Sequence, residues 1–151
     1  MATLPLLIDA PGRGLVGIAR LAAHGESLRQ GHDVEYFTLP VRSLLNRCTA
    51  ARMPFTWTIN PYRGCEFACK YCYARYTHEF MELRDGIDFE RKIYVKQHAA
   101  ELLRQELRRV NPGEEIAIGT ATDPYQPIER RLEVTAPSWK SYPGMPGWSW
   151  V

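Results

Sequence analysis

The chain has 151 residues, of which 45% are hydrophobic, so it can bury one moderate core. Its 19 basic residues nearly balance its 17 acidic ones, which excludes a strong global field toward nucleic acids or membranes. No apolar run approaches the ~18 residues of a membrane-spanning helix, and the apolar start Met1–Asp9 lacks the basic segment of a signal peptide. These features predict a cytoplasmic protein without a membrane partner and leave nucleic-acid binding open.

Residues 1–50 are predicted to form an N-terminal extension without a chemical signature. Several glycines disfavour helices there, although residues 15–28 are still predicted to hold a short helix. Residues 34–39 alternate weakly in polarity and indicate a strand, and residues 43–45 indicate a helical turn.

Residues 51–135 alternate between predicted strands and helices. The strands are expected at 55–59, 92–95 and 115–122, and the helices at 74–83, at 98–110 and from 130 onward. In the helix at 98–110, Leu103, Leu107 and Val110 share one face, with glutamates and arginines opposite. This alternation is typical of right-handed βαβ units and predicts an α/β fold with a parallel sheet.

The third predicted strand, 115–122, is apolar on both faces and is expected inside a sheet. Residues 136–151 break the periodicity with three tryptophans and three prolines, and are predicted to be an irregular tail, either native sequence or the product of a frameshift. We therefore expect about three βα units, truncated after the third strand. The uncovered edge of that strand predicts self-association.

The candidate chemistry concentrates in the loop at 60–73. It holds three of the four cysteines, Cys65, Cys69 and Cys72, at the spacing C-x3-C-x2-C. Residues this close rarely form disulfides, and the chain carries no export signal, so a metal site is favoured. Three thiolates can wrap one face of an iron–sulfur cube. Because a 4Fe–4S cluster normally takes four cysteines, one iron would keep an open coordination position.

Positive side chains flank the three thiols. They are Arg63, Lys70 and Arg75. We expect them to lower the thiol pKa and to offset the negative charge of a cluster.

The cysteine spacing, with Tyr71 just before the third cysteine, resembles the signature of the radical S-adenosylmethionine superfamily. The stretches Asn60-Pro-Tyr-Arg-Gly-Cys65 and Gly119-Thr-Ala-Thr-Asp-Pro-Tyr-Gln-Pro127 resemble more closely the branch that contains spore photoproduct lyase. The resemblance covers residues 55–135. It implies a (βα) barrel, here partial, and a 4Fe–4S cluster whose open iron binds S-adenosylmethionine.

The same resemblance implies an activity and a partner. S-adenosylmethionine would be cleaved reductively to a 5′-deoxyadenosyl radical that acts on an unidentified substrate, with electrons from a donor such as a ferredoxin or flavodoxin. No catalytic side chain is assigned, because spore photoproduct lyases use a cysteine downstream of the cluster and none follows Cys72 here. With the barrel expected to be truncated, an inactive fragment is a second outcome.

Four further residues are candidates for binding S-adenosylmethionine. The active sites of (βα) barrels form at the C-terminal ends of the strands, where Lys96, Thr120 and Thr122 are expected. Lys96 can pair with the carboxylate of the cofactor, and the resemblance implies that Tyr71 approaches its adenine.

Two alternatives use the same cysteines without catalysis. With His78 as a fourth ligand they would form a Cys3His zinc site, and with Cys48 they would form an iron–sulfur module for electron transfer. Structural zinc loops usually pair two cysteines with a distant second half, whereas here all ligands are local. The open cluster is therefore the favoured interpretation.

Overall fold

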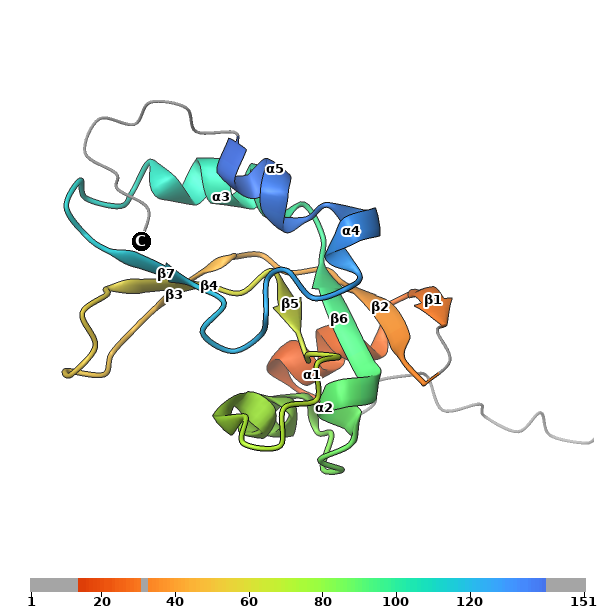
Figure 1. Cartoon of the computed structure of the whole chain (residues 1–151). Coiled ribbons are helices and arrows are strands. Elements are labelled where there is room, and N and C mark those ends of the chain that lie inside the picture. Colours follow the sequence, from red (N-terminus) through yellow and green to blue (C-terminus); the bar gives the residue numbers. More distant parts are fainter. Residues whose placement is uncertain (1–13, 31–32, 141–151) are drawn as a thin grey trace, which may run out of the picture.

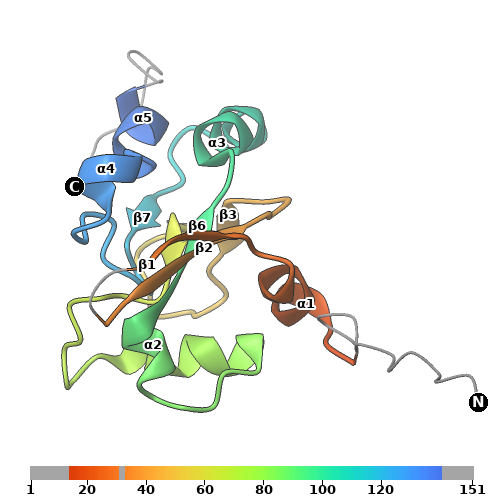
Figure 2. The ribbon, with the colours of Figure 1, turned by 90° about the vertical axis from the view of Figure 1, so that its right-hand side faces the viewer.

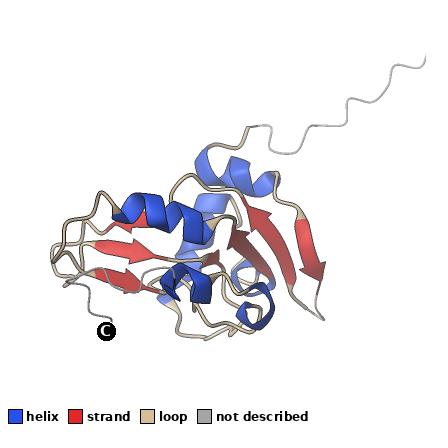
Figure 3. Ribbon diagram, turned by 90° about the horizontal axis from the view of Figure 1, so that it is seen from above, coloured by secondary structure: helices blue, strands red, loops and turns tan. Residues whose placement is uncertain are grey.

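The computed structural model describes residues 14–30 and 33–140, which form a mixed α/β fold with two small sheets (Figure 1). The first sheet has the order β1-β2-β6-β5, with β1 at Ser27–Gln30, β2 at Glu35–Leu39, β6 at Lys92–Lys96 and β5 at Tyr62–Arg63. The second has the order β3-β4-β7, with β3 at Leu45–Arg47, β4 at Trp57–Ile59 and β7 at Ile116–Ile118. Seen from above, the two groups of strands lie beside each other, and the described residues form no closed barrel (Figure 3).

Six helical segments accompany the sheets. They are α1 (Gly17–Ala23), the 3-10 helix η1 (Tyr73–Met81), α2 (Asp88–Arg91), α3 (Ala99–Leu107), α4 (Glu129–Leu132) and α5 (Thr135–Lys140). Helices α2 and α3 lie at opposite ends of β6, and α5 packs beside α3 (Figures 1 and 2). Within residues 14–30 and 33–140, no helix is long and apolar enough to cross a membrane.

The sheets are not the single parallel sheet that the sequence predicts. Strand β4 pairs in parallel with β7, but β6 pairs in parallel with β2, with Tyr36 opposite Ile93. The other strand pairs are antiparallel. Strand β2 takes this place because Tyr36, Thr38 and Leu39 are all buried against its neighbours. Residues 1–50 therefore contribute strands to both sheets.

Three local predictions need correction. Residues 43–45 do not form a helical turn, because Leu45 begins β3 and lies opposite Ile59. The helix predicted at 74–83 is a 3-10 helix at Tyr73–Met81. The predicted irregular tail begins too early, since Thr135–Lys140 is helical, and Pro137 is tolerated in the first turn, where its missing N–H has no helical acceptor. Residues 141–151 lie outside the described part of the chain.

The largest core cluster packs α3 onto the second sheet. Leu103 and Leu107 are buried against Leu44 and Ile59, which confirms the apolar face predicted for this helix. Glu106 departs from the pattern, because its carboxylate accepts the backbone N–H groups of Leu44 and Leu45, each at 2.9 Å. A residue assigned to the solvent side thus holds the start of β3.

Candidate functional site

The cysteine loop leaves β5 through a glycine that no other residue can replace without strain. Gly64 has a φ of +84°, and a Cβ there would lie 2.8 Å from the Lys92 carbonyl oxygen and 2.9 Å from that of Phe89. The next N–H, that of Cys65, donates to the Phe89 carbonyl at 2.9 Å. The first cysteine is therefore fixed against the backbone around α2 and β6.

Two tight turns follow within the loop. The N–H of Ala68 donates to the Cys65 carbonyl at 3.4 Å, and the N–H of Cys72 donates to the Cys69 carbonyl at 3.0 Å. All three cysteines are free thiols. Cys65 is buried beside Cys72, whereas Cys69 lies on the exposed turn between them.

The environment of Cys65 differs from the sequence prediction. Burial raises the pKa of the Cys65 thiol, and backbone hydrogen bonds from Asp123 and Phe67 offset part of that increase. None of the predicted flanking cations is among the causes of this shift, and the Arg63 guanidinium donates to the Thr77 carbonyl at 3.5 Å. Burial is therefore the main influence on the pKa of the Cys65 thiol.

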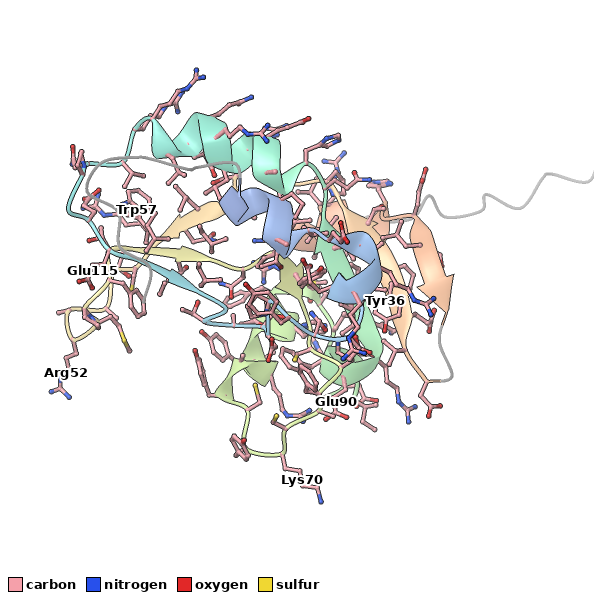
Figure 4. All side chains as sticks on the ribbon, turned by 45° about the horizontal axis from the view of Figure 1, so that its top comes forward. Tyr36, Arg52, Trp57, Lys70, Glu90 and Glu115 are labelled. Carbon is pink, nitrogen blue, oxygen red and sulfur yellow. The ribbon has the colours of Figure 1, made fainter. Side chains whose placement is uncertain are left out.

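The other two predicted cations have different places. Arg75 donates to the Cys69 carbonyl at 3.0 Å and forms an ion pair with Glu90, so it holds the exposed turn of the loop. Lys70 lies at the outer tip of the loop, pointing away from the fold (Figure 4). Of the flanking cations, Arg75 is the one that supports the cysteine loop structurally.

The donor chemistry of the loop fits an iron–sulfur cluster, although the thiols are not gathered. Among residues 14–30 and 33–140, no three Cys, His, Asp or Glu side chains are arranged to hold a metal ion. Cys65 and Cys72 share one cluster of side chains, whereas Cys69 is exposed. Three thiols on one loop match the ligand type and count of a cluster with an open iron.

The fourth ligand of the zinc alternative lies elsewhere. His78 is 1% exposed, with Nε2 at 3.2 Å from the Lys92 carbonyl oxygen. Its ring packs edge-on against Phe89 and Tyr94, and burial lowers its pKa. The structure therefore does not bring His78 to the three cysteines.

Hydrogen bonds join the C-terminal ends of three strands beside this loop. The Asn60 side chain, after β4, donates to Thr120 Oγ1 at 3.1 Å and accepts the Ala121 N–H at 2.7 Å, after β7. The N–H of Lys96, at the end of β6, donates to the Pro61 carbonyl at 3.1 Å. The expected meeting of these strand ends is confirmed.

A cavity of about 330 Å³ lies against these strand ends. Two cations, Arg63 and Lys96, line it together with Asn60, Tyr73 and Thr120. Lys96 is 4% exposed, and burial, with a further contribution from the Arg63 charge, lowers its pKa to about 8. No ion pair joins either cation to a carboxylate in the described ranges. A buried lysine and a half-buried arginine beside a cavity can bind an anionic group.

The four predicted cofactor-binding residues separate in the structure. Lys96 and Thr120 line the cavity. Thr122 lies beneath the cysteine loop, where its hydroxyl donates to the Gly64 carbonyl at 2.6 Å, and Tyr71 is 90% exposed and outside the cavity wall.

Sequence reasoning missed three cavity residues. Asn60 and Arg63 entered the sequence analysis as part of the stretch that resembles the family, and Arg63 also as a flanking charge, but neither was assigned to a binding site; Tyr73, whose hydroxyl donates to the Thr120 carbonyl, was not considered. All three lie within or just after the Asn60–Cys72 stretch, so their nearness to the cysteines was the available signal.

Comparison with known proteins gives relatives without an assigned activity. The chain is 42% identical over 125 residues to uncharacterized proteins of Mycobacterium tuberculosis strain H37Rv and Mycobacterium bovis, a match that covers 80% of this chain and 35% of each relative. It is 29% identical over 79 residues to an uncharacterized protein of Methanocaldococcus jannaschii, covering 52% of this chain and 28% of that protein. The chain thus spans about a third of the length of its mycobacterial relatives. No family model and no solved structure matches it.

Proposed function

We propose that this chain is the cluster-binding part of a radical S-adenosylmethionine protein of the branch that resembles spore photoproduct lyase. Cys65, Cys69 and Cys72 would hold a 4Fe–4S cluster, and the cavity beside Lys96 and Thr120 would take S-adenosylmethionine. The observation that carries the proposal is the adjacency of a loop with three free thiols and a cavity lined by two cations, the buried Lys96 and the half-buried Arg63, that form no ion pair in the described ranges.

The bound groups would supply the difficult chemistry, namely reductive cleavage of S-adenosylmethionine to a 5′-deoxyadenosyl radical. The chain's own residues bind and orient. Lys96 and Arg63 would attract the carboxylate of the cofactor, and the Asn60 clamp would hold Thr120 at the cavity wall. Tyr71 would approach the adenine only after the exposed turn of the loop closes.

The finer fold that we propose is a partial barrel of the radical S-adenosylmethionine type. It is supported by the parallel pairing of β4 with β7 and by the cavity at the C-terminal ends of β4, β6 and β7. An electron donor such as a ferredoxin or flavodoxin would approach the exposed turn that carries Cys69, in the cytoplasm. The substrate, and whether nucleic acid is involved, depend on residues beyond this site.

The first experiment is anaerobic reconstitution with iron and sulfide. We expect a brown protein with about four irons and four sulfides per chain. Replacing Cys65, Cys69 or Cys72 with alanine should abolish the cluster, and the matched control Cys48→Ala should retain it. A colourless protein with one tightly bound zinc would contradict the proposal in favour of a structural zinc site.

A second measurement tests the cofactor. Adding S-adenosylmethionine to the reduced cluster should change its electron paramagnetic resonance spectrum, and Lys96→Ala and Tyr71→Ala should weaken that response. An unchanged spectrum at saturating cofactor, with the cluster intact, would contradict the assignment of the cavity while leaving the cluster in place.

A further inference from the structure

The two peptide groups that flank Cys65 are both hydrogen-bonded by side chains that lie about 60 residues further along the chain. The Gly64 carbonyl accepts the Thr122 hydroxyl at 2.6 Å and the Gln126 amide Nε2 at 3.4 Å. The Glu66 N–H donates to Gln126 Oε1 at 3.2 Å. The backbone on each side of the first cysteine is therefore held from the loop after β7.

The residues that hold this backbone are themselves fixed. Gln126 is 0% exposed, and its Nε2 also donates to Thr122 Oγ1 at 3.2 Å, so both polar atoms of its amide are bonded. Asp123 Oδ1 accepts the Tyr125 N–H at 2.8 Å, a turn that shapes the segment between them. A buried amide with every polar atom satisfied adopts a single orientation.

The same segment reaches the cysteine from a second direction. The Glu66 carboxylate accepts the Ile128 N–H at 3.0 Å and the Tyr36 hydroxyl at 2.8 Å, which ties the loop to α4 and to β2. Among the three cysteines of the loop, Cys65 is buried while Cys69 is exposed, so these contacts act on the backbone of the most buried candidate ligand.

We propose that Thr122 and Gln126 are positioning residues that fix the backbone on both sides of Cys65, and thereby slow the loss of iron and set the reduction potential of the cluster. This inference rests on the proposed function. The potential of a cluster depends on hydrogen bonds to its sulfurs and on solvent exposure, and replacing a partner of a metal ligand typically costs about 10- to 100-fold in metal affinity. In this inference Thr122 acts through the backbone of the cysteine loop.

The test uses the reconstituted chain without S-adenosylmethionine. Thr122→Val keeps the size of the side chain but removes the donor to Gly64, and Thr122→Ser keeps the donor. The matched control is Thr38→Val, which removes a hydroxyl equally buried in β2 that accepts the Glu26 N–H at 2.8 Å, away from the loop. The readouts are the midpoint reduction potential, the rate of iron loss to a chelator, and thermal unfolding of the cluster-free protein.

We expect Thr122→Val to shift the midpoint potential and to lose iron roughly 10-fold faster than the wild type. Thr122→Ser should restore both values, and Thr38→Val should lower the unfolding temperature without moving the potential. Gln126→Glu, which places an acceptor against the Gly64 carbonyl, is a second variant and should shift the potential in the same direction.

Two results would overturn the inference and leave the proposed function in place. Thr122→Val and Gln126→Glu could both keep the wild-type potential and iron release, or Thr38→Val could shift the potential as far as Thr122→Val. A wild-type chain that forms no cluster would contradict the proposed function, and this inference with it.

Discussion

The Lys96 ammonium lies in the cavity wall beside the Arg63 guanidinium, with 4% of its surface exposed. A buried charge without a paired carboxylate raises the free energy of the folded state, which is why its pKa falls to about 8. The Glu106 charge offsets only a smaller part of this cost. The cost is understandable if the site binds an anion, because the ligand would then supply the missing negative charge.

Lys96→Met should therefore stabilise the chain while weakening its response to S-adenosylmethionine. At pH 7 we expect a gain in the free energy of unfolding on the order of 2 kcal/mol, since the penalty for the buried ammonium is removed. The unfolded chain holds this proton up to the ordinary lysine pKa of about 10.5, whereas the folded chain releases it near pH 8. The penalty is thus fully present below pH 8 and is relieved as the pH rises toward 10.5.

Chemical denaturation of both proteins at pH 7 and pH 9.5 checks this. The advantage of the methionine variant should shrink at the higher pH, where the wild-type lysine is largely neutral. A variant less stable than the wild type at both pH values would show that the ammonium is satisfied inside the fold.

At the residue scale, the sequence indicates the three candidate cysteine ligands, because their spacing is local and specific, but not the residues that surround them. The partners of Cys65, namely Thr122 and Gln126, could not be predicted, because they meet the loop only through pairing of β4 with β7. Polar residues that act across such a distance carry no periodic signal of their own.

Helix α3 packs on the second sheet and also forms hydrogen bonds to the start of β3. Its Glu106 carboxylate accepts the backbone N–H groups of Leu44 and Leu45, which precede and begin β3. Buried N–H groups without an acceptor destabilise a fold, so this side chain sets the position of β3 as much as the apolar contacts of Leu103 do.

Glu106→Ala should lower the free energy of unfolding by about 2 kcal/mol, because the buried N–H groups of Leu44 and Leu45 lose their acceptor. The control is Glu101→Ala on the exposed side of the same helix, which should change stability by less than about 0.5 kcal/mol. Denaturant titration of the two variants provides the comparison. Equal effects would mean that water replaces the carboxylate at Leu44 and Leu45.

At the element scale, a helix or strand was predicted correctly when its apolar pattern was long enough. The helix at Ala99–Leu107 was predicted because its apolar repeat extends over several turns. Strand β3 was missed because Leu44 and Leu45 form too short an apolar run to distinguish a strand from a helical turn. The segment forms a strand because Leu45 pairs with Ile59 and Glu106 accepts its backbone N–H groups. Both contacts come from residues distant in the sequence.

In the whole molecule, β7 is the edge of the second sheet and has a partner on one side, β4, within the described chain. Ile116 and Ile118 lie half-buried there, although the sequence predicted a strand covered on both sides. A short apolar edge strand can pair with another chain. The sequence predicted one parallel sheet, but the strands form two sheets, because β2 from residues 1–50 pairs with β6.

We therefore expect the chain to self-associate in proportion to its concentration, as measured by light scattering after size-exclusion chromatography. Ala117→Lys places a charge in the middle of β7 and should shift the population toward monomer. The control is Glu115→Lys, which adds positive charge at an exposed residue just before the strand. A wild-type monomer at all concentrations would contradict pairing through this edge.

The parallel pairings also set the order in which the chain can fold. Strands β1 and β2, and likewise β3 and β4, are antiparallel neighbours that can meet soon after synthesis. Strand β2 pairs in parallel with β6, and β4 with β7, each partner lying about 60 residues later in the chain. At the usual pace of a ribosome this is a delay of about 3 to 12 seconds. During that interval two hairpins with open edges must wait for their partners, and the loop with the three cysteines emerges before the strand-end segment that holds Cys65.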